Sequence, residues 1–353
     1  MTRNRKVAIS SVFDVLTDYA SLRGSVVPQP PPPAYRTIYG DTEQVAILTR
    51  MTCSEYFRAS AHVAMGIFEY NQERFVGVMG FDFEPDIAEL GAVDVGAGAG
   101  IVMYLEFDAV PKASPLTVVN IVSAQSSADD NYLGHDFESI RQLFPSLQLF
   151  EIAPSAISSS NWPLLLRVAI GEAAQGGSWV GAALQQAVCD LADLQAPVFP
   201  YAALCRAIFD LDPRNLFMAL YRCIEATYAR DACEKLRTEL GLRAPWYELA
   251  VKLDRSLGWR AAEAASINTT LINAAEDDLR AICDLLAAEI KDDLSVAAGR
   301  AIYRLRNKIV HFRASDDQNY AADIDWDLVC KHMAYVVRDV FGAAFVHFDE
   351  SMG

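Results

Sequence analysis

The segment Gly299-Arg-Ala-Ile-Tyr-Arg-Leu-Arg-Asn-Lys-Ile-Val-His-Phe-Arg313 predicts one helix with two different faces. Apolar side chains recur along it at helical spacing, at Ile302, Leu305, Ile309 and Phe312. Its basic side chains are Arg300, Arg304, Arg306, Lys308 and Arg313. No acidic residue lies between Leu294 and Ala314, although the formal net charge of the chain is −16. The segment is therefore a local reversal of charge, and it is the best candidate for contact with an anionic partner.

A short motif lies inside this helix. Arg306 and Asn307 are followed by His311, five positions after the arginine. This spacing, with Ile302-Tyr303 ahead of it, resembles the R-x(4–6)-H motif of HEPN domains. An earlier segment also resembles the opening helix of bacterial HEPN domains, through Phe217, Leu220, Tyr221, Arg222 and Glu225. The resemblance covers roughly residues 212–348 and implies a small antiparallel helical bundle.

The resemblance also implies a chemistry. HEPN ribonucleases cleave RNA without a metal, through attack of the 2′-hydroxyl on the adjacent phosphorus, which leaves a 2′,3′-cyclic phosphate. It implies that His311 transfers the proton, because imidazole titrates near neutral pH. Arg306 would stabilise the phosphorane oxygens, and Asn307 would orient the pair or contact phosphate. No metal or other cofactor is expected. The expected RNA-binding residues are Arg300, Arg304, Lys308 and Arg313.

The position of the motif on a helix favours a dimer. Residues five apart on an α-helix differ by about 140° in direction, so Arg306 and His311 do not point the same way. The resemblance implies that two motif helices meet across a twofold axis and line one composite cleft. Glu225 is expected to support the site by pairing with an arginine of the motif helix; alternatively it pairs with Arg222 or Arg230 on its own helix.

Two other functions stay open. His311 lies near a helix C-terminus, where the helix dipole favours a protonated imidazole without any catalysis. The bundle would then be a non-catalytic module that dimerises or binds nucleotides. In a second alternative, a small-molecule enzyme occupies the N-terminal part and the bundle is its scaffold.

Composition excludes several classes of protein. The 353 residues suffice for two domains, and 52% hydrophobic content indicates a globular chain. No apolar run approaches the roughly 18–20 residues of a membrane span, so no membrane partner is expected. We see no secretory signal, and seven dispersed cysteines favour a reducing compartment, which predicts a cytoplasmic protein. The strong acidity disfavours a general nucleic-acid binder.

The predicted fold class is α+β. An N-terminal β-rich or α/β domain is expected over 1–154, a helical connector over 155–211 and a HEPN-like bundle over 212–353. Three runs rich in β-branched and aromatic residues predict strands, at 75–81, 101–107 and 116–122. A short helix is expected within 136–144. The glycine-rich stretch 91–100 reads as a link between strands, because it lacks the Lys-Ser/Thr pair of a phosphate-binding P-loop.

Capping signals place the helices of the bundle. One helix is expected to start after Asp212-Pro213 and to stop at Gly241, and another to run from 246 to 257 before Gly258. A long helix is expected from about 269 to 292, and a final one from Asp325 to about 345. No histidine has a partner at metal-ligand spacing, and the acidic run 323–327 is expected to cap a helix.

The sequence therefore predicts a HEPN-type endoribonuclease, by family resemblance a toxin or an antiviral effector. Its expected partners are an RNA substrate and a second copy of the chain. The N-terminal domain is expected to meet a silencing protein or a trigger ligand.

Overall fold

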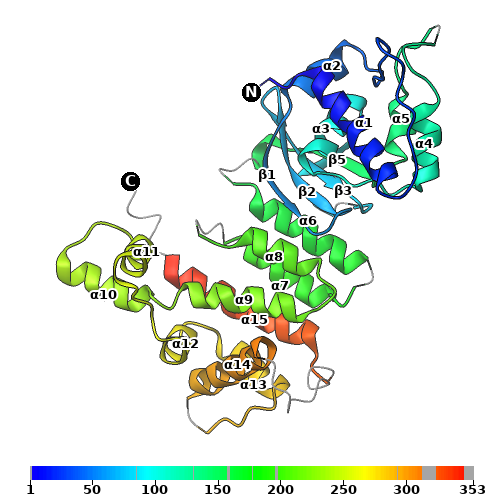
Figure 1. Ribbon diagram of the computed structural model, residues 1–353. Helices are drawn as coiled ribbons and strands as arrows, with labels where there is room; N and C mark the ends of the chain where they lie inside the picture. Colours follow the sequence, from blue (N-terminus) through cyan, green and yellow to red (C-terminus); the bar gives the residue numbers. More distant parts are fainter. Residues whose placement is uncertain are drawn as a thin grey trace. The chain divides into compact units, whose positions relative to one another are not determined.

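The computed structural model describes residues 2–84, 86–129, 131–156, 160–176, 178–194, 198–291, 293–311 and 323–345, apart from the side chains at 264 and 265. The chain divides into two compact units, Met1–Val168 and Ala169–Gly353. Figure 1 shows a sheet with helices in the first unit and only helices in the described part of the second. The fold is thus α+β, as predicted.

The first unit contains a five-stranded antiparallel sheet. Its strands are β1 (Thr52–Arg58), β2 (Ala64–Tyr70), β3 (Glu73–Met79), β4 (Leu90–Val93) and β5 (Leu147–Ile152), in the order β1-β2-β3-β5-β4. Asn71 and Gln72 join β2 to β3, and both have positive φ, which is the geometry of a two-residue type I′ hairpin. Strand β3 confirms the strand predicted over 75–81.

Helices cover this sheet and complete its core. They are α1 (Arg5–Ser21), α2 (Thr42–Arg50), α3 (Ala97–Glu106), α4 (Pro115–Ser123) and α5 (Phe137–Arg141). Helix α3 lies against both α1 and α2, and α4 lies against α1. Phe107, at the end of α3, packs edge-on against Phe68 of β2, with ring centroids 5.4 Å apart. A single apolar cluster therefore joins these helices to the sheet.

Two predicted strands of this unit are wrong. Residues 101–107 and 116–122 lie mainly in α3 and α4. Pro115 stands in the first turn of α4, and the Ser114 hydroxyl accepts a hydrogen bond from the Thr117 N–H, so local capping starts a helix in spite of the β-branched residues. The short helix expected within 136–144 is confirmed as α5.

The glycines before α3 allow close packing. The Gly98 N–H donates to the side-chain oxygen of Gln44 at 2.7 Å. A Cβ atom at Gly98 would overlap the backbone carbonyl of Gln44, and one at Gly100 would overlap the ring of Phe137. Gly96 caps the N-terminus of α3, so the expected link between strands is in fact a helix start. Contact with α2 and α5 thus explains these glycines without a phosphate.

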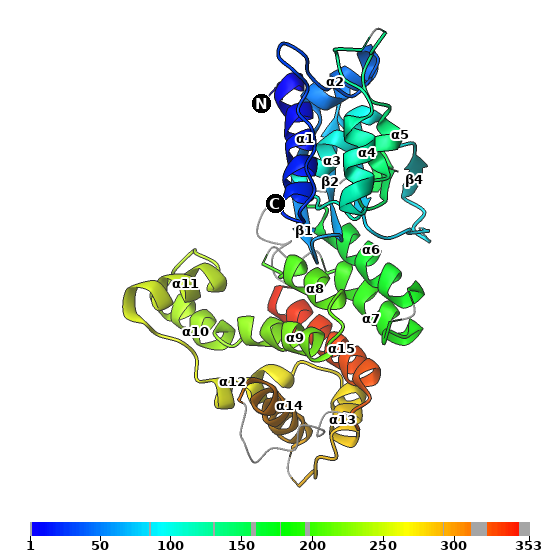
Figure 2. The same cartoon turned by 45° about the vertical axis from the view of Figure 1, so that its right-hand side comes forward.

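The described part of the second unit is helical. Its helices are α7 (Ala182–Ala192), α8 (Tyr201–Ile208), α9 (Arg214–Ala226), α10 (Arg230–Leu240), α11 (Trp246–Leu257), α12 (Glu263–Leu271), α13 (Glu276–Leu285), α14 (Leu294–Val310) and α15 (Trp326–Phe345). Helix α6 (Trp162–Gln175) crosses the limit between the units. Helix α15 contacts α7, α9 and α13, and Figure 2 shows it running beside α7 and α9. The expected connector over 155–211 is therefore divided: α7 and α8 are parts of the second unit.

Several predicted helix ends are confirmed, and two helices are broken. Gly258 ends α11 in a left-handed conformation, and Asp325 caps α15 by accepting from the Leu328 N–H at 3.1 Å. The helix expected from 213 to 241 divides into α9 and α10, although Gly241 ends α10 as predicted. The long helix expected over 269–292 divides into α12 and α13, where the Asn273 side chain bonds to the Thr270 carbonyl.

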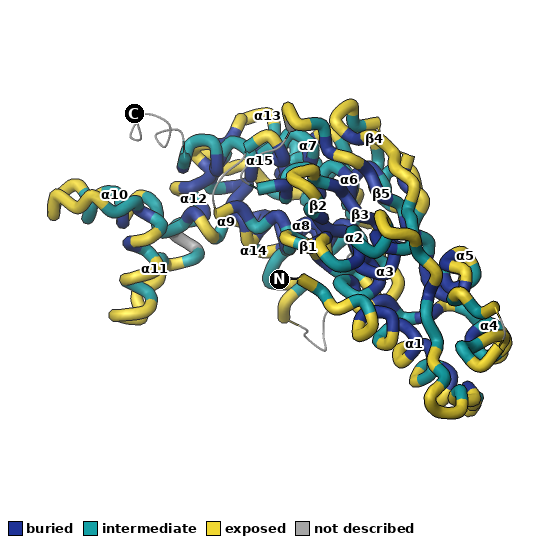
Figure 3. The backbone as a smooth tube through the Cα atoms, turned by 90° about the horizontal axis from the view of Figure 1, so that it is seen from above, coloured by how far each residue is buried: buried dark blue, intermediate teal, exposed yellow. Residues whose placement is uncertain are grey.

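Burial is uneven within this unit. Helix α15 has buried residues in every turn, whereas α10 and α11 are largely exposed, as Figure 3 shows. A small apolar cluster around Cys233 and Trp246 nevertheless joins α10 and α11 to Ala344 of α15. Among the described residues, no helix combines the length and the hydropathy that a bilayer crossing requires.

Candidate functional site

The motif helix α14 is fixed by its cap and by one apolar face. The Asp293 carboxylate accepts from the Ser295 N–H at 2.8 Å, so the helix begins five residues before the predicted start at 299. Ile302 and Leu305 are buried, as their spacing predicts. Phe312 and Arg313, which were expected to extend the helix, lie outside the described residues.

Arg306 points toward neighbouring helices of the second unit and is largely shielded from solvent. Its guanidinium lies 3.4 Å from the Glu263 carboxylate, between Nη2 and Oε1, and 5.7 Å from the centre of the Tyr221 ring. It also donates to the side-chain oxygen of Asn307 at 2.9 Å. Only 20% of the Arg306 side chain is exposed. The expected pair Arg306–Asn307 is thus brought together, with a carboxylate that the motif does not contain.

Tyr221 of α9 and Tyr228, which follows α9, complete the surroundings of Glu263. The Tyr221 hydroxyl donates to Glu263 Oε1 at 2.6 Å, and the Tyr228 hydroxyl donates to that of Tyr221 at 3.4 Å. Burial raises the pKa of both phenols, so both stay protonated near neutral pH. They therefore act as hydrogen-bond donors around the carboxylate.

Glu225 belongs to the same group. Burial raises the pKa of the Glu225 carboxyl, and so do the charge of Glu263 and a hydrogen bond between the two carboxyls; Arg306 and Arg222 lower it. The structure thus places Glu225 within the electrostatic range of a motif arginine and of Arg222. We call this group, Tyr221, Glu225, Tyr228, Glu263 and Arg306, the Arg306 cluster.

One polar atom in this cluster lacks a partner. The Nε atom of Arg306 is buried and forms no hydrogen bond within the described residues. A buried N–H without an acceptor is rare in folded proteins. Arg306 therefore retains one donor that the described residues do not use.

His311 is in different surroundings. It is the C-cap of α14, and its backbone is extended, with φ −106° and ψ 100°. Its N–H donates to the Asn307 carbonyl at 3.0 Å, and its side chain is exposed. Within the part of the chain that is described, that side chain forms no hydrogen bond. Asn307 therefore contacts both other residues of the motif. Its side-chain oxygen accepts a hydrogen bond from Arg306, and its backbone carbonyl accepts one from the His311 N–H.

Exposed basic residues line the helix up to His311. Arg300, Arg304 and Lys308 are exposed, and with His311 they are spaced by four, four and three residues, which puts all four on one face. We call these four residues the basic stripe. A run of cations on one face of a helix can follow a phosphate backbone.

The other acidic and histidine motifs have structural partners. His332 Nδ1 lies 2.7 Å from Asp278, and the Asp327 carboxylate accepts from the Gly181 N–H at 2.6 Å. In the described ranges, no three His, Cys, Asp or Glu side chains are arranged to hold a metal ion.

Comparison with known proteins identifies no relative. The chain matches no protein-family model, no curated protein and no solved structure.

Proposed function

We propose that the second unit is a HEPN-type ribonuclease that cleaves RNA without a metal ion. The 2′-hydroxyl attacks the adjacent phosphorus and the bond to the 5′-oxygen breaks, which leaves a 2′,3′-cyclic phosphate and a 5′-hydroxyl. The observation that carries this proposal is the basic stripe, which leads along α14 to the exposed His311. In the proposal, Arg304 and Lys308 contact phosphates, and His311 moves the proton. An imidazole suits this role because its ring nitrogens can both accept and donate a proton.

The role of Arg306 depends on its ion pair. Within one chain Glu263 already neutralises part of its charge, and the partly buried guanidinium fixes the Asn307 side chain. We therefore assign Arg306 first to positioning Asn307 and the end of α14. For Arg306 to stabilise the phosphorane directly, a phosphate oxygen has to replace Glu263 or to accept from the unpartnered Nε atom.

A second copy of the chain completes the proposed site. One chain presents one His311 and one stripe, whereas cleavage requires a proton donor and an acceptor around one phosphate. A twofold pair of α14 helices would supply both. By its family resemblance, we place this activity in a cytoplasmic toxin or antiviral effector that a partner or a ligand holds inactive.

The deciding experiment is cleavage of mixed cellular RNA in EDTA, with end-group analysis of the products. We compare wild type with His311→Ala and with His62→Ala, an exposed histidine of the first unit. His311→Ala should lose at least about 100-fold in rate, and His62→Ala should keep wild-type activity. The products should carry cyclic phosphate ends. Equal rates in wild type and His311→Ala, or activity that EDTA abolishes, would contradict the proposal.

One observation favours the non-catalytic alternative. Arg306 is paired with the Glu263 carboxylate within one chain. Its charge therefore already contributes to the packing of the helices. In that case the bundle serves dimerisation, and no condition yields cyclic phosphate ends. Light scattering gives the oligomeric state of the chain. A chain that is monomeric at all concentrations excludes the composite ribonuclease site.

A further inference from the structure

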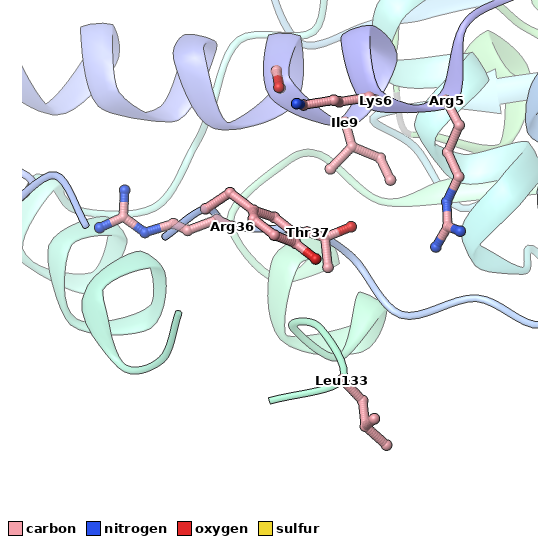
Figure 4. A pocket seen from close by; sticks show the side chains of 8 residues that line it. Arg5, Lys6, Ile9, Arg36, Thr37 and Leu133 are labelled. Carbon is pink, nitrogen blue, oxygen red and sulfur yellow. The ribbon is translucent and has the colours of Figure 1, made fainter. Parts of the chain in front are cut away.

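The first unit contains a basic cavity that the proposed ribonuclease does not use. Its volume is about 540 Å³, and it lies between the start of α1, the segment 35–37 and Leu133. Figure 4 shows Lys6 and Ile9 on the helix, Arg36 and Thr37 across from them, and Arg5 at one end. The volume falls in the range of small-molecule sites. The residues that line it are Arg5, Lys6, Ile9, Ser10, Tyr35, Arg36, Thr37 and Leu133.

The charge of the lining is opposite to that of the unit. Residues 1–168 contain 11 basic and 19 acidic side chains, yet three of the basic ones and none of the acidic ones line the cavity. Other arginines of the unit have carboxylate partners: Arg3 pairs with Glu106, Arg58 with Asp108 and Arg74 with Glu69. No carboxylate of a described residue lies within ion-pair distance of the three cavity cations. The cavity therefore concentrates positive charge that the fold leaves uncompensated.

The start of α1 adds to this positive charge. Arg5 and Lys6 stand in the first turn, which contains no acidic residue, and Asn4 caps the helix by accepting from the Val7 N–H at 3.2 Å. Cations at a helix N-terminus are unfavourable, because the dipole is positive there. An anion at this position relieves the repulsion, and a phosphate offers acceptors to cationic side chains.

The wall across from the helix is held in place before any ligand arrives. The Tyr35 N–H donates to the Ser127 hydroxyl at 2.7 Å, and the Thr37 N–H donates to the Tyr132 hydroxyl at 2.9 Å. Arg36 donates to the Pro28 carbonyl, while its buried Nε atom lacks an acceptor within the described chain. A fixed wall lowers the entropy that binding costs.

The rim supplies apolar contacts beside the charge. Tyr35 is 57% exposed and Leu133 is 75% exposed, and Ile9 of α1 adds a buried apolar side chain to the lining. The hydroxyls of Ser10 and Thr37 add polar contacts. Phosphate contacts at one end with an exposed aromatic ring nearby are what a nucleotide requires, since its base stacks on aromatic side chains.

We propose that this cavity binds a nucleotide, with Arg5 and Lys6 contacting its phosphate and Tyr35 contacting its base. Arg36 adds positive charge to the same cavity. A cavity of about 540 Å³ suits a small molecule, so the proposed ligand is a free nucleotide. This inference concerns the first unit alone and does not depend on ribonuclease activity.

The test is calorimetric titration of the full chain with AMP, ATP, adenosine and inorganic phosphate. The variant Arg5→Gln/Lys6→Gln is compared with Arg23→Gln/Arg50→Gln, which removes the same charge from exposed arginines outside the cavity. We expect AMP or ATP to bind at least about tenfold more tightly than adenosine, and the cavity variant to lose at least about tenfold. The control should stay within about twofold of wild type.

Several outcomes overturn the inference. They are no binding of either nucleotide, equal affinity for AMP and adenosine, or an unchanged affinity in the cavity variant. Inorganic phosphate that binds as tightly as AMP removes the base contact from the proposal. A 5′-phosphorylated oligonucleotide that binds more tightly than AMP, and loses affinity in the cavity variant, assigns the site to RNA ends.

The comparison of AMP with adenosine uses the wild-type protein, so its result stays valid even if the cavity variant unfolds. Nucleotide binding without RNA cleavage would contradict the ribonuclease alone.

Discussion

Arg306 and the cations of the first-unit cavity differ in their neighbours. Arg306 has carboxylates beside it, whereas the cavity cations have none among the described residues. Arg306 lies among two carboxyls and two phenols, and Glu263 pairs with it. Arg5 and Lys6 face a cavity that no carboxylate lines. A partly buried cation with a partner supports the fold, since its removal leaves a carboxylate unpaired. A cation without a partner stabilises nothing until an anion arrives, and this is the arrangement of a binding site.

The largest effect is expected from Arg306→Ala. The change leaves Glu225 and Glu263 close together without their cation, and it removes packing against Tyr221. We expect the free energy of unfolding to fall by about 2–3 kcal/mol, below the value for a fully buried pair because both partners are partly exposed. Urea unfolding followed by circular dichroism measures it. Arg304→Ala, an exposed position on the same helix, should change stability by less than about 0.5 kcal/mol. Equal losses in both variants would mean that the cluster does not hold the bundle.

RNA affinity should change at the exposed cations of the same helix. Arg304→Gln is expected to weaken RNA binding about threefold and to reduce the slope of log affinity against log salt by about 0.7, the value for one phosphate contact on a single strand. Fluorescence anisotropy at several salt concentrations gives the slope. Arg255→Gln, on exposed helix α11, is the control with the same change in charge. If both variants lower the slope equally, binding follows net charge and not the basic stripe.

Glu225→Gln tests the cluster through pH. The folded chain raises the pKa of Glu225, so it holds this proton more tightly than the unfolded chain does. The contribution of Glu225 to stability is therefore full at low pH and is lost as the pH rises through the raised value. Glutamine cannot lose a proton, so the variant should exceed wild type by about 0.5 kcal/mol at neutral pH and match it in acid. Urea unfolding across this pH range measures the difference, with Glu248→Gln as an exposed control. A stability difference between Glu225→Gln and wild type that does not change with pH would contradict a raised pKa of Glu225.

The smallest effect is expected at the cavity. Lys6→Glu replaces a cation by an anion in the first turn of α1, so it should raise the free energy of unfolding by about 0.5 kcal/mol. The same variant should lose nucleotide binding, whereas Lys6→Gln should gain less stability. Thermal unfolding with and without AMP measures both properties. A loss of stability in Lys6→Glu would show that the fold uses this lysine, and the contrast with Arg306 would then disappear.

Local signals predicted some elements well and failed for others. Gly258 and Asp325 mark helix ends by their own backbone and side chains, so their positions follow from short-range chemistry. Residues 101–107 look like a strand because they are rich in β-branched and aromatic residues, yet most of them lie in α3, which packs against α1 and α2. A short apolar run is ambiguous in this way whenever both faces are covered.

The site was predictable on one helix only. The spacing of Arg300, Arg304 and His311 predicted the basic stripe, because these residues lie on α14 or at its C-cap. Glu263 was not found, since it meets Arg306 only after α12 is placed beside α14. A local signal did exist for part of the cluster: Tyr221, Glu225 and Tyr228 follow helical spacing. The cavity joins Lys6 to Arg36 across 30 positions, and no periodic pattern connects them.

The contact between Asp327 and Gly181 has a consequence for how the chain is made. These residues are 146 positions apart, and through them the start of α15 holds the start of α7. During synthesis, α7, α9 and α13 leave the ribosome well before α15. Their apolar faces therefore stay exposed until α15 can cover them. Because loop closure over such a distance is slow, the second unit should fold late and as a whole. A chain interrupted before 326 would therefore engage chaperones, and any activity of α14 would begin only after synthesis of α15.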